Sequence, residues 1–363
     1  MKTSILALAC APLLLAACTQ QDDEVATLAD REAISFRPTM GALSRATEVT
    51  NANLPSVTVT ALLGDKNYFT DLLFSNDNAG FYTSEKSYYW PGDNSTVNFY
   101  AYYPDAETLG ADVTINNTTK EVANFAVNSE IADQVDFITA TATGNKKDNE
   151  ASGVPMQFKH RLAQIEIHAK SANTNYTYKV AGVRIGRAQY LGTYSFTDDK
   201  WTLDDWHDTD VYTSSCTPVT LSANPVNIMG DSGNAMLLPQ TLVGWDPVGD
   251  PDNVAREAYL SVLINITSDT GVTVYPWPTD TKLDANGQKR QYAWASIPLS
   301  GTWEQGKKYI YTLDFTDGAG NVDPDDPNPG QVVLGDAIKV VPTVVDWEDS
   351  DTSIPMTPVK SNK

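Results

Sequence analysis

Cysteine and histidine are scarce in this sequence of 363 residues, which contains three of each. Three cysteines are too few for a disulfide framework. On one strand, His160 and His168 would lie about 26 Å apart at roughly 3.3 Å per residue, too far for a shared metal ion. His207 lies in the acidic stretch 204–210, which could be read as a calcium or sugar loop. A solvated loop with Trp206 packed on the core is the simpler interpretation.

Catalytic motifs are also missing. The sequence has no phosphate loop, no Gly-x-Ser-x-Gly elbow and no His-Glu-x-x-His. Its many carboxylates give no reason to choose two as the acid and base of a glycosidase. The acidic residues 323–326 lack the spacing of a calcium hand. We therefore expect no catalytic residue, no metal site, no cofactor and no enzyme activity.

Positive charge is the third scarce feature. Lys and Arg number 25 against 46 Asp and Glu, so the formal net charge is −21. Nucleic acid is a poor partner for so acidic a chain, because binding it requires basic side chains that displace phosphate counterions. Apolar content, in contrast, is ample: 41% hydrophobic and 10% aromatic residues are enough to build cores. The length suggests two domains.

An apolar run, residues 5–17, follows Lys2 at the N-terminus. It is shorter than the roughly 20 residues of a bilayer-spanning helix, so residues 1–17 are predicted to be a signal peptide. The run ends in Leu-Ala-Ala-Cys at 15–18, which resembles the lipobox of bacterial lipoproteins. This resemblance implies that Cys18 is acylated and anchors the mature chain to the outer membrane. Ordinary signal cleavage beside a cysteine is the alternative.

The acidic run at 20–24 resembles the surface-export signal of lipoproteins from Bacteroides-type bacteria, and a solvated tether is the alternative. Cys10 is lost with the signal peptide and Cys18 is consumed by lipid. Cys216 is then left without an intramolecular partner. Because a lone thiol is most often a small buried hydrophobe, we expect Cys216 to be a core residue.

Apolar and polar residues alternate with a period of two along much of the chain, which predicts strands. The stripes lie at 57–62, 96–103, 163–169, 258–266 and 309–315. No long segment keeps a helical apolar period. One apolar face and one mixed face are typical of antiparallel sheets packed in sandwiches. The predicted fold class is all-β.

Two irregular stretches suggest how the chain is divided. The polar stretch 144–153 predicts a boundary between a first sandwich, 46–153, and a second, 154–348. The stretch 317–330 carries three prolines among acidic residues, so we expect a stiff, extended linker there. It is followed by an apolar strand pair at 332–347 and a tail at 349–363.

The motifs resemble, in chain order, those of the fimbrillins, the subunits of type V pili. Residues 89–93, Tyr-Trp-Pro-Gly-Asp, with 97–104 resemble the signature of the first domain, and 136–140 resemble its last strand. Residues 154–163 are similar to the strand that opens the second domain. The remaining matches are 237–240, 303–309 and the ending at 323–347. Each motif also has a plain interpretation as a strand, a turn or core residues.

This resemblance implies two tandem antiparallel β-sandwich domains of transthyretin-like Greek-key topology. It also implies a structural pilus subunit that supports adhesion and is exported as an outer-membrane lipoprotein. An Arg-specific extracellular protease would process the lipid-anchored precursor on the cell outer membrane. The partners in the extracellular fimbrium would be other copies or related subunits in a head-to-tail polymer, together with a host or bacterial surface receptor.

A short strand next to the lipid tether is predicted where Ile34 and Phe36 alternate with polar residues. Between Lys2 and Lys66 the only basic residues are Arg31, Arg37 and Arg45. Only cleavage after Arg45 releases both the lipid and the whole strand.

The resemblance implies a cleavage site of the Ser-Arg-Ala type, which here places Ala46 at the new N-terminus. Residues 18–45 are then a lipidated propeptide that contains a removable strand. An exposed loop arginine without a role is the alternative interpretation of Arg45.

Removing that strand would leave a groove that an extended segment of a neighbouring subunit can fill. The best donor candidate is 338–345, where Ile338, Val340 and Val344 share one face. Pro342 breaks the alternation and cannot donate a ladder hydrogen bond. The alternative is that 338–345 is simply the last strand of the second domain.

A different class of function is a permanently anchored surface lipoprotein that binds glycan or protein ligands. Its binding surface would be formed by exposed tryptophans, with Trp201, Trp206, Trp277 and Trp294 as candidates. Tryptophans in sandwiches are more often core residues, so the pilus subunit is the preferred hypothesis.

Overall fold

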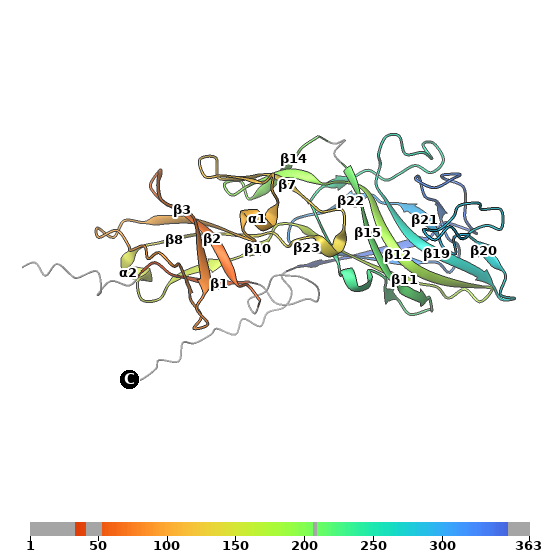
Figure 1. The fold of residues 1–363 in the computed structure, drawn as a ribbon, viewed down its shortest axis with the longest axis horizontal. Coiled ribbons are helices and arrows are strands. Elements are labelled where there is room, and N and C mark those ends of the chain that lie inside the picture. Colours follow the sequence, from red (N-terminus) through yellow and green to blue (C-terminus); the bar gives the residue numbers. More distant parts are fainter. Residues whose placement is uncertain (1–32, 41–52, 206–208, 348–363) are drawn as a thin grey trace, which may run out of the picture. The chain divides into compact units, whose positions relative to one another are not determined.

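The computed structural model describes residues 33–40, 53–205 and 209–347. The described chain is built from strands (Figure 1), and its few helices are short. The helices are α1 (Ala106–Leu109), α2 (Lys146–Asn149) and the 3₁₀ turns η2 (Ile131–Asp133) and η3 (Gly230–Ser232). The all-β prediction is confirmed.

The largest sheet has eight strands in the order β10-β8-β5-β2-β3-β4-β1-β9. Its strands are β1 (Phe36–Thr39), β2 (Ser56–Leu63), β3 (Lys66–Asn76), β4 (Tyr82–Thr83), β5 (Val97–Tyr103), β8 (Ile138–Gly144), β9 (Val154–Gln157) and β10 (Lys159–His160). β9 and β10 are consecutive in the chain but lie at opposite ends of this order. A single residue, Phe158, separates them.

The other sheets are formed mostly from later residues. A six-stranded sheet contains β12 (Tyr176–Gln189), β15 (Thr209–Thr220), β19 (Tyr259–Ser268), β20 (Thr273–Tyr275), β21 (Ala293–Pro298) and β24 (Asn321–Val322). A five-stranded sheet contains β11 (Ala163–Lys170), β16 (Val226–Asn227), β17 (Ala235–Leu237), β23 (Lys307–Asp314) and β25 (Lys339–Asp346). The smaller sheets contain β6 (Thr114–Asn116), β7 (Glu121–Ala126), β13 (Leu191–Ser195) and β14 (Lys200–Leu203), and β18 (Thr241–Leu242) with β22 (Gly301–Thr302).

Two strand pairs are parallel, which the prediction of antiparallel sheets did not include. β1 runs parallel to β9, and β11 runs parallel to β23. Parallel pairing requires a long connection between the strands. In both cases the partners are more than a hundred residues apart in sequence. The local alternation of apolar and polar residues therefore could not predict these pairings.

The sheets also do not follow the expected boundary after residue 153. β9 and β10 belong to the eight-stranded sheet, whose other strands all lie before that residue. In the opposite direction, β7 pairs with β13, so residues 121–126 share a sheet with 191–195. Residues 154–160, which were expected to open a second domain, therefore pair with strands that precede residue 153. The division into two sandwiches stays a prediction.

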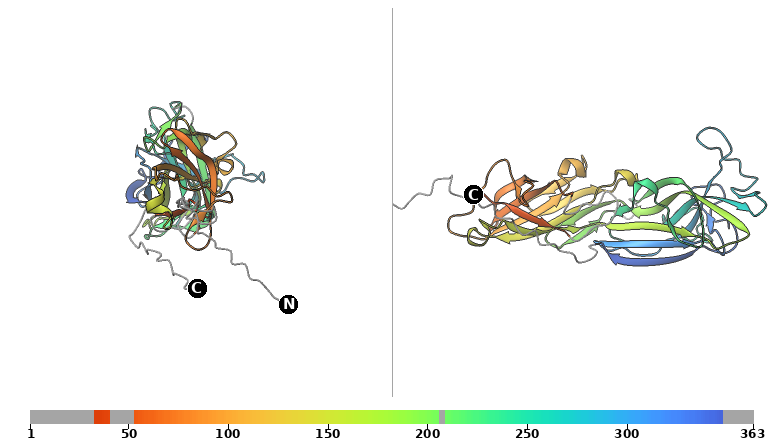
Figure 2. Two further views of the ribbon diagram at one scale, coloured as in Figure 1. Left: turned by 90° about the vertical axis from the view of Figure 1, so that its left-hand side faces the viewer. Right: turned by 90° about the horizontal axis from the view of Figure 1, so that it is seen from below.

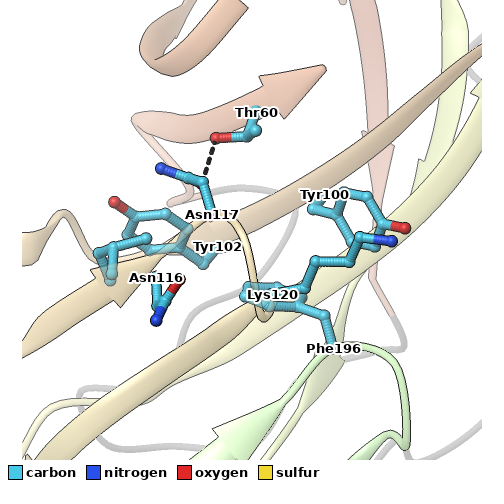
Figure 3. A pocket seen from close by; sticks show the side chains of 8 residues that line it. Thr60, Tyr100, Tyr102, Asn116, Asn117, Lys120 and Phe196 are labelled. Atoms are coloured by element: carbon cyan, nitrogen blue, oxygen red, sulfur yellow. Dashed lines mark hydrogen bonds between the residues drawn. The ribbon is translucent and has the colours of Figure 1, made fainter. Parts of the chain in front are cut away.

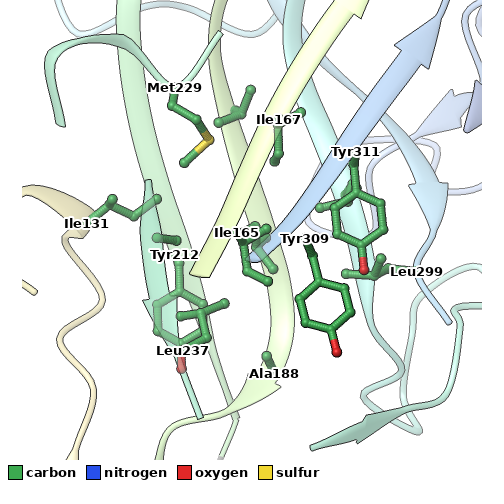
Figure 4. Packing of buried hydrophobic residues seen from close by; sticks show 14 of the residues in the cluster. Ile131, Ile165, Ile167, Ala188, Tyr212, Met229, Leu237, Leu299, Tyr309 and Tyr311 are labelled. Atoms are coloured by element: carbon green, nitrogen blue, oxygen red, sulfur yellow. The ribbon is translucent and has the colours of Figure 1, made fainter. Parts of the chain in front are cut away.

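The apolar residues form two clusters. One lies within the eight-stranded sheet and includes Phe36, Phe74 and Phe99. The other is formed mainly by the five- and six-stranded sheets and the small β13-β7 sheet. Figure 4 shows part of this larger cluster, where Ile165 of β11 packs with Tyr309 of β23 and neighbouring side chains. The period-two stripes at 163–169 and 309–315 thus supply core residues, as predicted.

The expected stiff linker at 317–330 is instead tied to the six-stranded sheet. Asp323 is completely buried, and its carboxylate accepts hydrogen bonds from Ser261 (2.5 Å), Ser296 (3.1 Å) and Arg184 (3.3 Å). Burial raises the pKa of Asp323 against the opposing influence of Arg184. The linker prediction is wrong because the residues that bind the aspartate come from strands far away in sequence.

A second buried aspartate of this segment, Asp326, is paired with Lys282 and with Arg290, the latter at 2.7 Å. Burial opposes its ionisation, but the hydrogen bonds from both cations outweigh burial and lower its pKa. Asp325 lies between the two buried residues and is more exposed, with Arg187 at 2.9 Å.

Replacing Asp326 by Asn should therefore lower the free energy of unfolding by about 2–3 kcal/mol, because a buried charge cluster loses one partner. The half-exposed ammonium of Lys282 limits this cost, since water can still solvate it. The control Asp325→Asn should cost less than about 1 kcal/mol, as expected of an exposed pair. Urea unfolding of both variants measures their free energies of unfolding. Equal losses for the two variants would contradict the stronger role given to the buried Asp326.

The same pair predicts a pH dependence. The ordinary carboxyl pKa is 3.8 and the folded value of Asp326 is lower. The contribution of Asp326 to the free energy of unfolding is thus complete above pH 3.8. It is lost as the pH falls through the lowered pKa of the folded state. The stability difference between the wild-type chain and Asp326→Asn should shrink over that acidic interval and stay constant above it.

Candidate functional site

The N-terminal strand β1 is an internal strand of the eight-stranded sheet, between β4 and β9. It pairs antiparallel with β4 at Phe36 and Tyr82. It pairs parallel with β9 from Phe36 and Val154 to Thr39 and Gln157. β9 ends the strand order, and among the described residues β1 is its one strand partner. Losing β1 would therefore leave both β4 and β9 with unpaired backbone groups.

Further backbone hydrogen bonds extend this ladder before the start of β1 and past the end of β9. They run from the amide of Ile34 to the carbonyl of Tyr88 (2.7 Å), from Val154 to Ser35 (2.9 Å) and from Phe158 to Thr39 (2.8 Å). The paired segment thus covers residues 34–39, two residues more than the strand bounds indicate.

The inward side chains of this segment are fully buried. Ile34 is 1% exposed and Phe36 is 0% exposed. The ring of Phe36 makes edge-to-face contacts with Phe74 (4.7 Å between centroids) and Phe99 (5.0 Å). Met40 is also buried. The prediction that Ile34 and Phe36 belong to a buried strand segment is confirmed, and its removal stays a prediction.

The outward side of the segment is different. The guanidinium of Arg37 lies 4.4 Å from the centroid of the Phe81 ring. The Thr39 hydroxyl donates to the carbonyl of Met156 (3.4 Å). Pro38 has no amide hydrogen, yet it lies inside the strand opposite Met156. The sheet therefore accepts a proline at this position.

The processing residues expected from the sequence, Cys18, Arg45 and Ala46, lie outside the described residues. The described chain leaves β1 at Met40 and resumes at Asn53 before β2. Arg45 therefore belongs to the covalent connection between β1 and β2. Lipidation of Cys18 and cleavage after Arg45 stay predictions.

The candidate donor segment lies at the edge of the five-stranded sheet (Figure 2, right). β25 pairs antiparallel with β23 from Lys339 and Asp314 to Asp346 and Lys307. Its other edge has no strand partner within the described chain. In contrast to β1, β25 is held by backbone hydrogen bonds on one side.

The apolar stripe predicted for this segment is only partly buried in its own subunit. Ile338 is buried just before β25, and Val340 packs partly against the core. Val344 is 53% exposed, and Val341 on the opposite face is 56% exposed. The strand thus carries apolar surface that its own subunit does not cover.

Trp347 holds the end of β25. It is buried and stacks on the imidazole of His160, with 4.2 Å between centroids and 5° between planes. Its amide donates to the carbonyl of Gly306 (2.9 Å). His160 Nδ1 in turn contacts Asp136 (3.0 Å), so the expectation of a satisfied edge histidine is confirmed. The stack itself was not predicted, because no local pattern relates residues so far apart.

Two exposed ion pairs, Lys307 with Asp346 and Lys339 with Asp317, also involve β25 or its partner strand. Solvent screens exposed pairs of this kind, so they add little to stability. The ladder with β23 and the buried side chains of Ile338 and Trp347 are therefore the main contacts that keep β25 on its own subunit.

The pocket in Figure 3 is too small for an organic ligand. It is lined by aromatic and amide side chains, among them Tyr100, Tyr102 and Phe196, and its cavity volume is about 10 Å³. The Thr60 hydroxyl donates to the Asn117 side chain at 2.9 Å. A volume of this size is comparable to that of one water molecule.

The candidate glycan-binding tryptophans are partly buried where the structure describes them. Trp201 donates to the carbonyl of Arg161 (2.6 Å). Trp277 packs on Tyr275, with 5.4 Å between centroids. Trp294 is covered by the guanidinium of Arg184, 3.9 Å from the ring centroid. Trp206 lies outside the described residues, so the glycan hypothesis gains no support here.

The structure also bears on metals, thiols and membranes. Within the described ranges, no group of three or more His, Cys, Asp or Glu residues could hold a metal ion. Cys216 is partly buried against the core, and burial raises the pKa of its thiol. In the same ranges no helix is long and apolar enough to cross a membrane.

Comparisons with known proteins agree with this arrangement of strands. A fimbrial protein from Bacteroides vulgatus ATCC 8482 is 16% identical, with a TM-score of 0.56 over 87% of this chain and 99% of that one. A candidate cell adhesion protein from Bacteroides ovatus ATCC 8483 is 16% identical, with a TM-score of 0.50 over 88% and 99% of the two chains. At this identity the likeness shows the fold. A search of curated proteins gave no match.

The family comparison extends over most of the sequence. A family described as fimbrillin-like matches residues 44–347, from the connection after β1 to the tryptophan after β25. This range includes every strand described above apart from β1. The chain therefore belongs to the fimbrillin-like family.

Proposed function

We propose that this chain is a structural pilus subunit that is lipidated on Cys18, cleaved after Arg45 and polymerised by strand exchange. Membership of the fimbrillin-like family supports a fimbrial or adhesion role at the cell surface. The observation that carries the finer proposal is the position of β1. It is an internal strand, and its covalent connection to β2 passes through Arg45.

In the uncleaved chain, β1 is tethered beside its own groove and excludes other strands. Cleavage after Arg45 turns it into a separate peptide that can dissociate and be diluted. Burial of Ile34 and Phe36 contributes roughly 1.5–3 kcal/mol for each side chain. Once the peptide leaves, the edges of β4 and β9 and the apolar contacts around Phe74 and Phe99 are open to an incoming strand.

β25 of a neighbouring copy is the proposed replacement. On its own subunit it has one strand partner and exposes Val344, whereas in the groove it would pair on both sides and bury that side chain. The gain in pairing and burial offsets the loss of the ladder with β23. Donor and acceptor lie in different sheets, so the contact is head-to-tail and need not close into a ring.

Cleavage at Arg45 is tested first. The purified full-length chain treated with an Arg-specific protease should give a product that begins at Ala46 and assembles into fibres. Arg45→Ala should abolish fibres, because β1 stays covalently attached, whereas Arg37→Ala should leave assembly intact. N-terminal sequencing and electron microscopy provide the readouts. Fibres from Arg45→Ala, or wild-type monomers that persist after complete cleavage, would contradict the proposal.

The donor role of β25 is tested by one matched pair of substitutions. Val344→Asp and Val341→Asp introduce the same charge at similarly exposed positions, so both monomers should unfold at the same denaturant concentration. Only Val344 would face the groove, so Val344→Asp should abolish assembly and Val341→Asp should preserve it, because an unpaired buried charge is costly. Cleaved Val344→Asp chains, which can accept but not donate, should also shorten wild-type fibres. Equal behaviour of the two variants would exclude β25 as the donor.

A further inference from the structure

We propose that residues 338–344 of a second copy replace residues 34–40 position by position, with Ile338 in the place of Ile34. This inference rests on the proposed strand exchange and specifies its register. The two segments read Ile-Ser-Phe-Arg-Pro-Thr-Met and Ile-Lys-Val-Val-Pro-Thr-Val. They share isoleucine at the first position, proline at the fifth and threonine at the sixth.

The buried positions support this register. In the described structure the first, third and seventh positions of the N-terminal segment are buried, at Ile34, Phe36 and Met40. The donor has Ile338, Val340 and Val344 at the same positions. Every side chain that the groove buries would therefore be replaced by another apolar side chain.

Registers shifted by two residues keep the same face inward, but they are energetically unfavourable because each one buries a carboxylate. A shift in one direction places Asp336 in the buried position of Ile34. A shift in the other direction places Asp346 in the buried position of Met40. Since a buried unpaired carboxylate is costly, each aspartate excludes one of the two shifted registers. A shift by one residue turns the apolar face outward.

The proline has a role in this comparison. Pro342 is unfavourable in a central strand because it cannot donate a ladder hydrogen bond. Pro38 occupies the matching position in β1 and is accommodated there opposite Met156. The groove is therefore already built around a residue without an amide hydrogen, and Pro342 fits in this register alone.

The main mismatch is in size. Phe36 contacts both Phe74 and Phe99, and the shorter side chain of Val340 would leave part of that space empty. The register therefore predicts that a larger side chain at residue 340 strengthens the fibre. The same enlargement at residue 341, which would take the outward position of Arg37, should not.

The register is tested directly with cysteine pairs in a Cys216→Ser chain. In the precursor Thr39 lies opposite Gln157, and both side chains are exposed. Fibres of a cleaved Thr343→Cys, Gln157→Cys chain should form covalent multimers with a short thiol cross-linker. The control pair Val341→Cys, Gln157→Cys reports a slip by two residues and should remain uncross-linked. Multimers from the control pair alone would overturn the register while leaving strand exchange intact.

A second arm does not require fibres. A peptide of residues 337–347 carrying Thr343→Cys is added to the cleaved Gln157→Cys chain after the β1 peptide has been removed. Cross-linking at this position, and not with a Val341→Cys peptide, supports the register even if polymerisation fails. Absence of cross-linking from both peptides would overturn the register, whereas absence of fibres alone would count against the proposed function.

Val340→Phe tests the size argument, with Val341→Phe as its matched control. Val340→Phe fibres should dissociate about tenfold more slowly in denaturant, since affinity changes within one interface appear mainly in the off-rate. Val341→Phe fibres should dissociate at the wild-type rate. Unfolding of the uncleaved monomers controls for effects on the donor's own fold. Equal rates for the two variants would contradict the proposed position of residue 340.

Discussion

The pairing of β1 with β9 is the contact on which the proposed exchange of strands depends. β9 has no other strand partner among the described residues and leads through Phe158 directly into β10. β10 carries His160, which stacks on Trp347 at the end of β25. The strand β1 thus pairs with β9, and the strand that follows β9 carries the histidine on which the end of β25 packs. Under the proposed function, a cut in the connection between β1 and β2 makes this pairing reversible.

The two terminal strands differ in the way that exchange requires. β1 has partners on both sides and buries its apolar face, and β25 has one partner and leaves Val344 exposed. A neighbour's β25 in the place of β1 would gain a second partner and cover that surface. The covalent link to β2 keeps the groove of the precursor filled. The full sequence has a net charge of −21, and mutual repulsion of this kind disfavours lateral association of such chains.

Local sequence patterns predicted the elements but not their partners. The alternation around Ile34 and Phe36 indicated a buried strand, and its burial is confirmed, because side-chain period is a local property. The parallel pairing of Phe36 with Val154 depends on a long connection and was not predicted. The Pro- and Asp-rich segment was expected to be an extended linker, and the buried contacts of Asp323 show otherwise. Its partners Ser261 and Arg184 lie on distant strands, which composition alone cannot identify.

The proposed polymer requires that the groove left by β1 is filled by the C-terminal strand of another copy. A cryo-electron microscopy structure of fibres grown from the chain that begins at Ala46 would show which strand occupies the groove. We expect density for residues 338–344 of the neighbouring subunit between β4 and β9, with β23 of the donor subunit uncovered. Density that shows β25 still paired with β23 of its own subunit would exclude the exchange of this strand.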